Sequence, residues 1–298
     1  MLGGQVSKIR SMREAASLVS DGATIGIGGL SMNSAPMGFV RELVRGDVRD
    51  LTVVSIVGSM AVDWLVASGK VRKVVTGLVS FEGLGLAPNF RRAAEAGDIE
   101  VEEYSEHLLI CRLQAAAHRL PFVPTKAGIG TDVLALHPDT TRLETDRVTG
   151  EVYVACTPLP IDVAVVHAHA ADADGNTRVD PKLIWMDSDL VRAADATVVT
   201  VEAVAPRSSF TDAPERTTYP RFMIDAVVHA PWGAYPTSNY PSYTHHEDFI
   251  QEYLSTSRDR DRFSRFWDDR ITAPDDQAGF LEANGGAATI LAITRRAT

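Results

Sequence analysis

Four residues, Gly26-Ile27-Gly28-Gly29, close an apolar run and precede a loop of small and polar residues. Glycines let a ligand come close to the backbone, and their free N–H groups can form an oxyanion hole. Gly28 and Gly29 are therefore candidate catalytic residues, and Ser31 and Asn33 in the loop are candidate substrate contacts. Glycines also mark tight turns that bind nothing, and this alternative stays open. A dinucleotide-binding fingerprint is excluded, because Ser31 stands where its third glycine would be.

Glu106 lies at the junction between a predicted strand and a predicted helix, in a segment with three carboxylates within five residues. Ser105 can cap the helix, so that Glu106 would project from its first turn. In a parallel sheet that turn lies near the carboxyl ends of the strands, where open α/β sheets bind ligands. Glu106 is therefore a candidate general base, with a pKa adjusted by partial burial. The alternative is a solvated acidic face or a capped helix start.

Lys126 lies in an apolar stretch, residues 123–130, between two turn signals. A single cation in such surroundings could bind the carboxylate or phosphate of an anionic substrate. The sequence thus makes Lys126 a candidate substrate-binding residue. A lysine side chain that simply extends into solvent is the alternative.

His167 and His169 lie two residues apart on a predicted strand and therefore share a face. A zinc site needs at least a third ligand, and the acidic residues at 172–176 are more simply explained as a turn. We therefore expect no metal. The sequence also contains no G-x-S-x-G elbow, C-x-x-C pair or P-loop, which excludes the common hydrolase, zinc-finger and NTPase motifs.

The first half of the chain alternates short apolar runs with helix-length segments. A continuous run such as Leu51-Thr52-Val53-Val54-Ser55-Ile56 is typical of a parallel strand buried on both faces. This order predicts an α/β fold with an open, mainly parallel sheet and flanking helices. The predicted strands are 23–27, 51–56, 71–76 and 100–104, and the predicted helices are 37–45, 61–68, 89–96 and 108–119.

The second half is less regular, with predicted strands at 152–155, 163–167, 197–201 and 226–229. Helices are predicted at 248–255 and 258–267, and residues 273–286 are rich in turn formers. The Pro- and Tyr-rich run 235–243 predicts an ordered loop. Because no repeat or linker interrupts the chain, we expect a single domain over 1–298, with 248–298 as a helical and irregular extension.

The composition limits the classes of partner. The chain has 298 residues, with 29 Lys and Arg against 39 Asp and Glu, a formal net charge of −10. This balance argues against a nucleic-acid or anionic-membrane partner, which would require a basic face. Cys111 and Cys156 lie in apolar surroundings and are expected to be reduced core residues. Residues 1–13 carry charges where a secretory peptide would need an apolar run, so we expect a cytoplasmic location.

Short motifs follow one another in a characteristic order between residues 26 and 238. They are Gly26-Ile27-Gly28-Gly29 followed by Pro36, Leu51-Thr52-Val53-Val54, Glu102-Glu103-Tyr104-Ser105, Leu120-Pro121-Phe122-Val123-Pro124-Thr125 followed by Gly130-Thr131-Asp132, Ala171-Asp172 with Gly175-Asn176, and Gly233-Ala234-Tyr235-Pro236-Thr237-Ser238. In this order they resemble the A (alpha) subunit of a family I CoA-transferase, closest in pattern to glutaconate CoA-transferase A subunits. The resemblance weakens over 139–151 and after 253.

That resemblance implies an open α/β fold, an α2β2 assembly with a separate B subunit, and ping-pong chemistry on acyl-CoA. Coenzyme A would enter as part of the substrate, with no other cofactor. In such enzymes a B-subunit glutamate in a Ser-Glu-Asn-Gly motif attacks the thioester and forms a covalent intermediate. Here Glu282-Ala283-Asn284-Gly285 matches that motif only superficially. The resemblance therefore assigns this chain one wall of the site, with Gly28 and Gly29 near the thioester.

Glu106 points to a second branch of the same fold. Ser105-Glu106-His107-Leu108-Leu109, leading into Gln114-Ala115-Ala116-Ala117, resembles the alpha subunit of steroid ring-cleaving CoA hydrolases. In that branch the alpha-subunit carboxylate promotes hydrolytic C–C cleavage, and the B-subunit nucleophile is absent. Lys126 stands where both branches usually carry an arginine, and a lysine cannot form a bidentate carboxylate clamp.

Three functions remain open on the sequence. The first is the A subunit of a heteromeric CoA-transferase, and the second is the alpha subunit of a ring-opening acyl-CoA hydrolase in which Glu106 activates water. The third is a non-catalytic scaffold subunit that only orders its partner and shapes the pocket.

Overall fold

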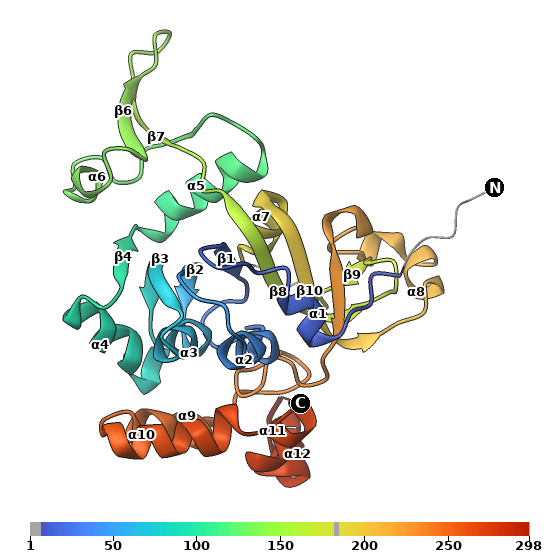
Figure 1. Cartoon of the computed structure of the whole chain (residues 1–298). Helices are drawn as coiled ribbons and strands as arrows, with labels where there is room; N and C mark the ends of the chain where they lie inside the picture. The colour runs from blue at the N-terminus through green and yellow to red at the C-terminus, as the bar shows by residue number, and fades with distance from the viewer. Residues whose placement is uncertain (1–6, 182–184, 298) are drawn as a thin grey trace.

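A central eight-stranded sheet organises the molecule, as seen in a computed structural model that describes residues 7–181 and 185–297 (Figure 1). Its strand order is β11-β10-β8-β1-β2-β3-β4, and all neighbours along this path are parallel. A short strand, β9, pairs antiparallel with β8. The predicted open, mainly parallel sheet is confirmed. The strands are β1 Thr24–Ile27, β2 Leu51–Gly58, β3 Val71–Val79, β4 Glu100–Glu103, β8 Ile161–Ala171, β9 Thr177–Arg178, β10 Ala194–Val204 and β11 Ala226–His229.

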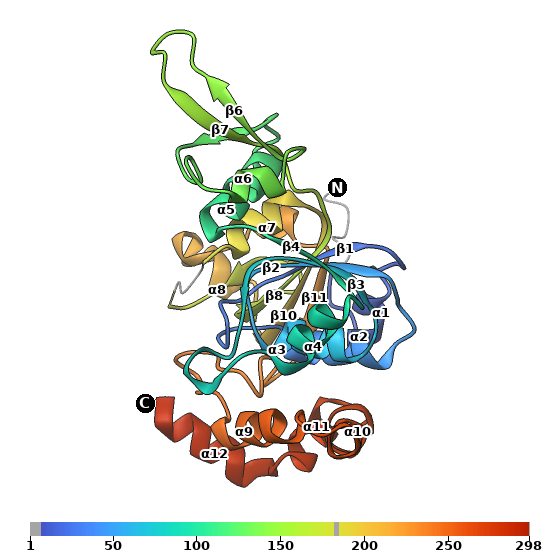
Figure 2. The ribbon, with the colours of Figure 1, turned by 90° about the vertical axis from the view of Figure 1, so that its left-hand side faces the viewer.

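Helices cover both faces of this sheet, as the continuous apolar strands require (Figures 1 and 2). On β2, Val53 belongs to one buried cluster and Val54 to the other, because successive side chains point to opposite faces. The first face carries α2 Met37–Arg45 and α3 Met60–Ala67, with α4 Pro88–Ala96 beside α3. The second carries α5 Glu106–Ala117 and α7 Asp187–Ala193, which pack against each other.

A small antiparallel sheet projects from the body next to α5 (Figures 1 and 2). Its order is β5-β7-β6, formed by β5 Val123–Thr125, β7 Val152–Cys156 and β6 Thr141–Thr145. Only β7 is predicted by the sequence. β6 is missed because it carries a single large apolar residue, Leu143, which is exposed here. The short elements are α1 Met12–Ala16, η1 Glu82–Leu84, α6 Val133–Leu136, α8 Ser208–Thr211, η2 Pro214–Arg216 and η3 Arg221–Met223.

The C-terminal part is helical and packs on α3 through aromatic side chains. Its elements are α9 Glu247–Thr256, α10 Arg260–Trp267, a π-helical turn η4 Asp268–Thr272, α11 Gln277–Ala283 and α12 Gly286–Ala297. The ring of Trp64 lies 6.0–6.3 Å from those of Phe249, Trp267 and Phe280. The buried Asp63 carboxylate accepts the hydroxyl of Tyr253 at 2.6 Å and the N–H of Phe90 at 2.7 Å. These contacts join α9 to α3 and α4.

One prediction for this part is wrong: residues 277–283 form helix α11 instead of turns. Asp276 caps it by accepting the N–H of Gly279 at 2.8 Å, and Phe280 on its first turns is buried against Trp64. The cap and one aromatic anchor therefore outweigh the turn-forming composition of the segment. The other predicted helices and strands are present, with boundaries shifted by a few residues.

Candidate active site

The loop after β1 begins with two glycines whose N–H groups both have partners. Gly28 donates to the carbonyl oxygen of Val165 on β8 at 2.8 Å, and Gly29 donates to Oδ1 of Asp187 at 2.9 Å. Gly29 has φ +87°, a conformation that favours glycine. The expectation that these two N–H groups are free is therefore wrong for the chain by itself. The N–H of Gly28 is hydrogen-bonded within the sheet, and the N–H of Gly29 is hydrogen-bonded to a carboxylate of the same chain.

Asp187, the first residue of α7, is a functional candidate that the sequence does not reveal. Its side chain is buried, and the N–H of Gly29 is its hydrogen-bond donor among the described residues. Burial raises the pKa of the Asp187 carboxyl to about 6, and the Gly29 N–H opposes that rise. No described Lys or Arg forms an ion pair with it. Asp187 and Gly29 are 158 residues apart, so no local motif could have paired them.

The charge on Asp187 predicts a pH-dependent stability. A carboxyl whose pKa is raised on folding stabilises the native state at low pH, and this contribution is lost as the pH rises from about 4 to above 6. Asp187→Asn is therefore expected to unfold like the wild type at pH 4 and to gain about 3 kcal/mol at pH 7.5. Urea denaturation at the two pH values measures this. An equal difference at both pH values would contradict the expected buried charge.

Ser31 and Asn33 are held differently within the loop. The N–H of Ser31 donates to the carbonyl of Val57 at the end of β2, and Ser31 has φ +51°. Its hydroxyl is buried and has no hydrogen-bond partner among the described residues. The side-chain oxygen of Asn33 accepts the hydroxyl of Ser238 at 3.0 Å. Asn33 thus ties the loop to the Tyr-rich segment 235–243, whereas the Ser31 hydroxyl is buried without a described partner.

Glu106 begins α5, and the hydroxyl of Ser105 accepts the N–H of Leu108, which confirms the predicted cap. An added Cβ at Gly77 would lie 3.0 Å from Cγ of Glu106 and 3.0 Å from the carbonyl oxygen of Ile56. Glu106 therefore lies over the carboxyl ends of β2 and β3. The expected partial burial is wrong, because the side chain is exposed. Its carboxylate has no hydrogen bond or ion pair within the described chain.

Lys126 follows β5 and faces the projecting sheet. Its Nζ lies 3.1 Å from Oε1 of Glu151 and 5.4 Å from the ring centre of Tyr153, and its side chain is 60% exposed. None of its described contacts is to the glycine loop or to Glu106. Glu106 thus lies at the carboxyl ends of β2 and β3, and Ser31 and the two glycines follow the carboxyl end of β1, whereas no described contact of Lys126 is to that edge.

The two histidines of β8 are part of a hydrogen-bond network. Nε2 of His167 lies 2.8 Å from Oε1 of Glu202, which also accepts the hydroxyl of Tyr243 at 2.6 Å. Nδ1 of His169 accepts the N–H of Asp180 at 3.1 Å. Across the described residues, no three His, Cys, Asp or Glu side chains gather as a metal would require. These hydrogen bonds hold the loop 235–243 against β8 and β10.

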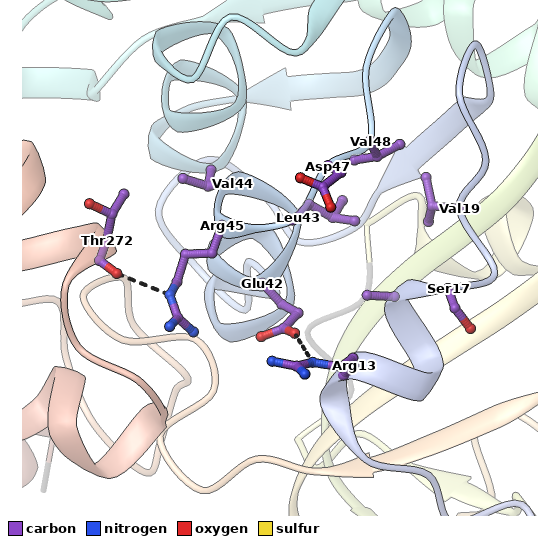
Figure 3. A pocket seen from close by; sticks show the side chains of 12 residues that line it. Arg13, Ser17, Val19, Glu42, Leu43, Val44, Arg45, Asp47, Val48 and Thr272 are labelled. Atoms are coloured by element: carbon purple, nitrogen blue, oxygen red, sulfur yellow. Dashed lines mark hydrogen bonds and ion pairs between the residues drawn. The ribbon is translucent and has the colours of Figure 1, made fainter.

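A groove with a volume of about 950 Å³ lies elsewhere, between α1, α2 and η4 (Figure 3). Arg13 faces Glu42 across it at 3.9 Å, and Nε of Arg45 donates to the carbonyl of Thr272 at 3.0 Å. It is lined by residues at the end of α2, just before β2 begins. These residues lie at the amino ends of the strands, opposite to the carboxyl ends where open α/β sheets bind ligands. The groove shares no residue with the candidate site.

An α/β protein with an exposed carboxylate and a glycine loop at the carboxyl edge of a parallel sheet belongs to the class that binds ligands at that edge. The family model described as coenzyme A transferase matches residues 9–230. The chain therefore belongs to the coenzyme A transferase family.

Individual relatives carry different activities. The chain is 36% identical over 267 residues to the cholesterol ring-cleaving hydrolase IpdA subunit of Rhodococcus jostii, covering 86% of this chain and 89% of that protein. It superposes on glutaconate coenzyme A-transferase from Acidaminococcus fermentans with a TM-score of 0.90 and 27% identity, over 96% of this chain and 95% of that one. It is 32% identical to an uncharacterized protein of Archaeoglobus fulgidus, over 97% of this chain but 64% of that protein.

Within the described residues, no helix is long and apolar enough to cross a bilayer.

Proposed function

We propose that this chain is the A subunit of a heteromeric CoA-transferase that acts on acyl-CoA thioesters. The observation that carries the proposal is the superposition on glutaconate coenzyme A-transferase over nearly the whole of both chains. A relative of 28% identity over 309 residues carries the name of the A subunit of that enzyme. Coenzyme A enters as part of the substrate, and no further cofactor is proposed.

The proposed partner is a B subunit that supplies the attacking glutamate, in an α2β2 assembly. Two relatives are named as subunits. The segment Glu282-Ala283-Asn284-Gly285 ends helix α11, and the amide of Asn284 donates to the carbonyls of Phe280 and Arg270. That segment thus serves packing, which supports a nucleophile outside this chain. Cys111 and Cys156 are buried and free, as suits a complex in the reducing cytoplasm.

A second candidate function is supported by Glu106. Its exposed carboxylate, without a partner among the described residues, overhangs the carboxyl ends of β2 and β3. A general base needs an accessible carboxylate near the reacting atoms, and a relative of 36% identity is named as a ring-cleaving hydrolase. In this alternative, Glu106 activates the water that opens a ring of a cyclic acyl-CoA.

One experiment separates the two. The chain is co-expressed with its partner subunit, and the purified complex is assayed for CoA exchange between acids and for net release of product from acyl-CoA in water. Exchange, with a glutamyl-CoA thioester trapped by borohydride on a Ser-Glu-Asn-Gly partner, is expected for the transferase. Turnover of acyl-CoA by water, with no trapped thioester, would refute the transferase and support the hydrolase. Turnover by this chain alone would contradict both.

Lys126 gives a separate prediction for substrate binding. If its cation leaves Glu151 for the acidic group of a substrate, Lys126→Ala raises KM about tenfold or more with little change in kcat, because a charge-assisted hydrogen bond is lost in both ground and transition states. Steady-state kinetics of the complex measure this. Glu151→Gln is the matched control, since it frees Lys126 and leaves KM equal or lower. An unchanged KM in Lys126→Ala would remove Lys126 from the site.

A further inference from the structure

Resting on the proposed acyl-CoA chemistry, we propose that Asp187 is a positioning residue that fixes the peptide of Gly29 and so sets the shape of the loop that carries Ser31 and Asn33. The contact is direct, from the Gly29 N–H to Oδ1 at 2.9 Å. It joins the start of α7 to the end of β1, at the edge where the candidate site lies. Asp187 would act through the loop without touching the substrate.

The space around the two glycines fits this role. A Cβ at Gly28 would lie 3.0 Å from Oδ1 of Asp187 and 2.8 Å from Cγ1 of Val166. The absence of a side chain at position 28 is therefore what allows the carboxylate to approach. At Gly29, φ is +87°, which turns the N–H toward α7. The Asp187 carboxylate thus needs the absent side chain of Gly28 and accepts the N–H of Gly29.

The charge of Asp187 supports the same role. A buried carboxylate without an ion-pair partner is costly, whereas an apolar side chain at this position would not carry that cost. The bond to Gly29 is the polar interaction that offsets the cost among the described residues. Of the titratable groups near it, Tyr219 is buried; burial raises the pKa of that phenol, and the charge of Asp187 raises it further.

The packing of α7 extends the effect toward Glu106. Helix α7 packs against α5, whose first residue is Glu106, and Leu190 on α7 lies against Gly26 on β1. A bond between Asp187 and Gly29 therefore fixes the loop relative to the helix that carries the candidate base. Misplacing a reacting group by about 1 Å can reduce a rate about 100-fold, so such a bond has a kinetic consequence.

The test uses two variants in the complex with the partner subunit. Asp187→Asn keeps an oxygen acceptor for Gly29, and Asp187→Leu removes it while keeping the same number and branching of side-chain heavy atoms. Hydrogen–deuterium exchange of a peptide spanning residues 26–36 is read by mass spectrometry, together with kcat and KM for an acyl-CoA. We expect Asp187→Leu to speed exchange in that peptide and to lower kcat about 100-fold with KM within about threefold, and Asp187→Asn to keep both near wild type.

Asp63→Asn is the matched control, because Asp63 is also a buried carboxylate that holds backbone N–H groups, at the start of α4. It is expected to alter stability without changing exchange in 26–36 or kcat. Unchanged exchange in Asp187→Leu, or faster exchange with an unchanged kcat, would overturn the positioning role. A wild-type complex that turns over no acyl-CoA would refute the proposed function, and the exchange of the peptide would then decide separately whether Asp187 fixes Gly29.

Discussion

Glu106→Ala in the complex with the partner subunit is expected to lower the kcat for hydrolysis of an acyl-CoA by about 100- to 10,000-fold, the usual contribution of a general base. The Glu106 side chain lies over the carboxyl ends of β2 and β3, and the loop that carries Ser31 is hydrogen-bonded to the end of β2. Because the Glu106 carboxylate makes no described hydrogen bond or ion pair, its removal is expected to leave the melting temperature nearly unchanged. Loss of rate without loss of stability is the signature of a residue that acts on the substrate.

Glu103→Ala is the control for that variant. Glu103 ends β4, three residues before Glu106, and its exposed side chain also makes no described hydrogen bond or ion pair. The Glu103→Ala substitution removes one negative charge from the same region as Glu106→Ala does. We expect its kcat to stay within about twofold of the wild-type value. Equal rates for Glu106→Ala and wild type would exclude Glu106 from catalysis. In a complex that only exchanges CoA between acids, the partner's glutamate carries the covalent step and Glu106→Ala has a smaller effect.

Gly29→Ala is expected to destabilise the chain by about 3–5 kcal/mol. Two causes add: an L-residue is strained at φ +87°, and the new Cβ would lie 2.6 Å from the carbonyl oxygen of Asn33 and 2.8 Å from the nitrogen of Ala35. Both close atoms are backbone, so neither can rotate away. Chemical denaturation of the purified chain measures the free energy of unfolding.

Gly22→Ala separates these two causes. Gly22 has φ +77°, and an added Cβ there meets nothing within 4 Å. This variant therefore carries only the conformational strain, about 1–2 kcal/mol. Equal losses of stability in the two variants would show that the loop backbone does not pack tightly around Gly29 and does not hold a fixed shape.

Much of the fold follows from local patterns. The Val-rich run of β2 predicts a buried parallel strand, and the alternation of such runs with amphipathic segments predicts α2 to α5 between the strands. Ser105 predicts the start of α5 and hence the position of Glu106. By contrast, β6 pairs with the neighbouring β7, and α11 packs on Trp64, which is distant in the chain, so the residues of β6 and α11 do not predict these elements by themselves.

Local patterns are enough to establish that the chain is α/β, that a glycine loop closes β1, and that Glu106 begins a helix at the edge of the sheet, because each of these depends on neighbouring residues. Which groups meet at that edge follows only from the packing of distant segments. The carboxylate of Asp187 accepts the N–H of Gly29, although the two residues are 158 positions apart in the sequence. Lys126 pairs with Glu151 instead of facing the glycine loop. Contacts of this kind depend on how strands and helices pack in three dimensions. The spacing of residues along the sequence indicates which residues share a face of one element, but it does not predict which elements pack together.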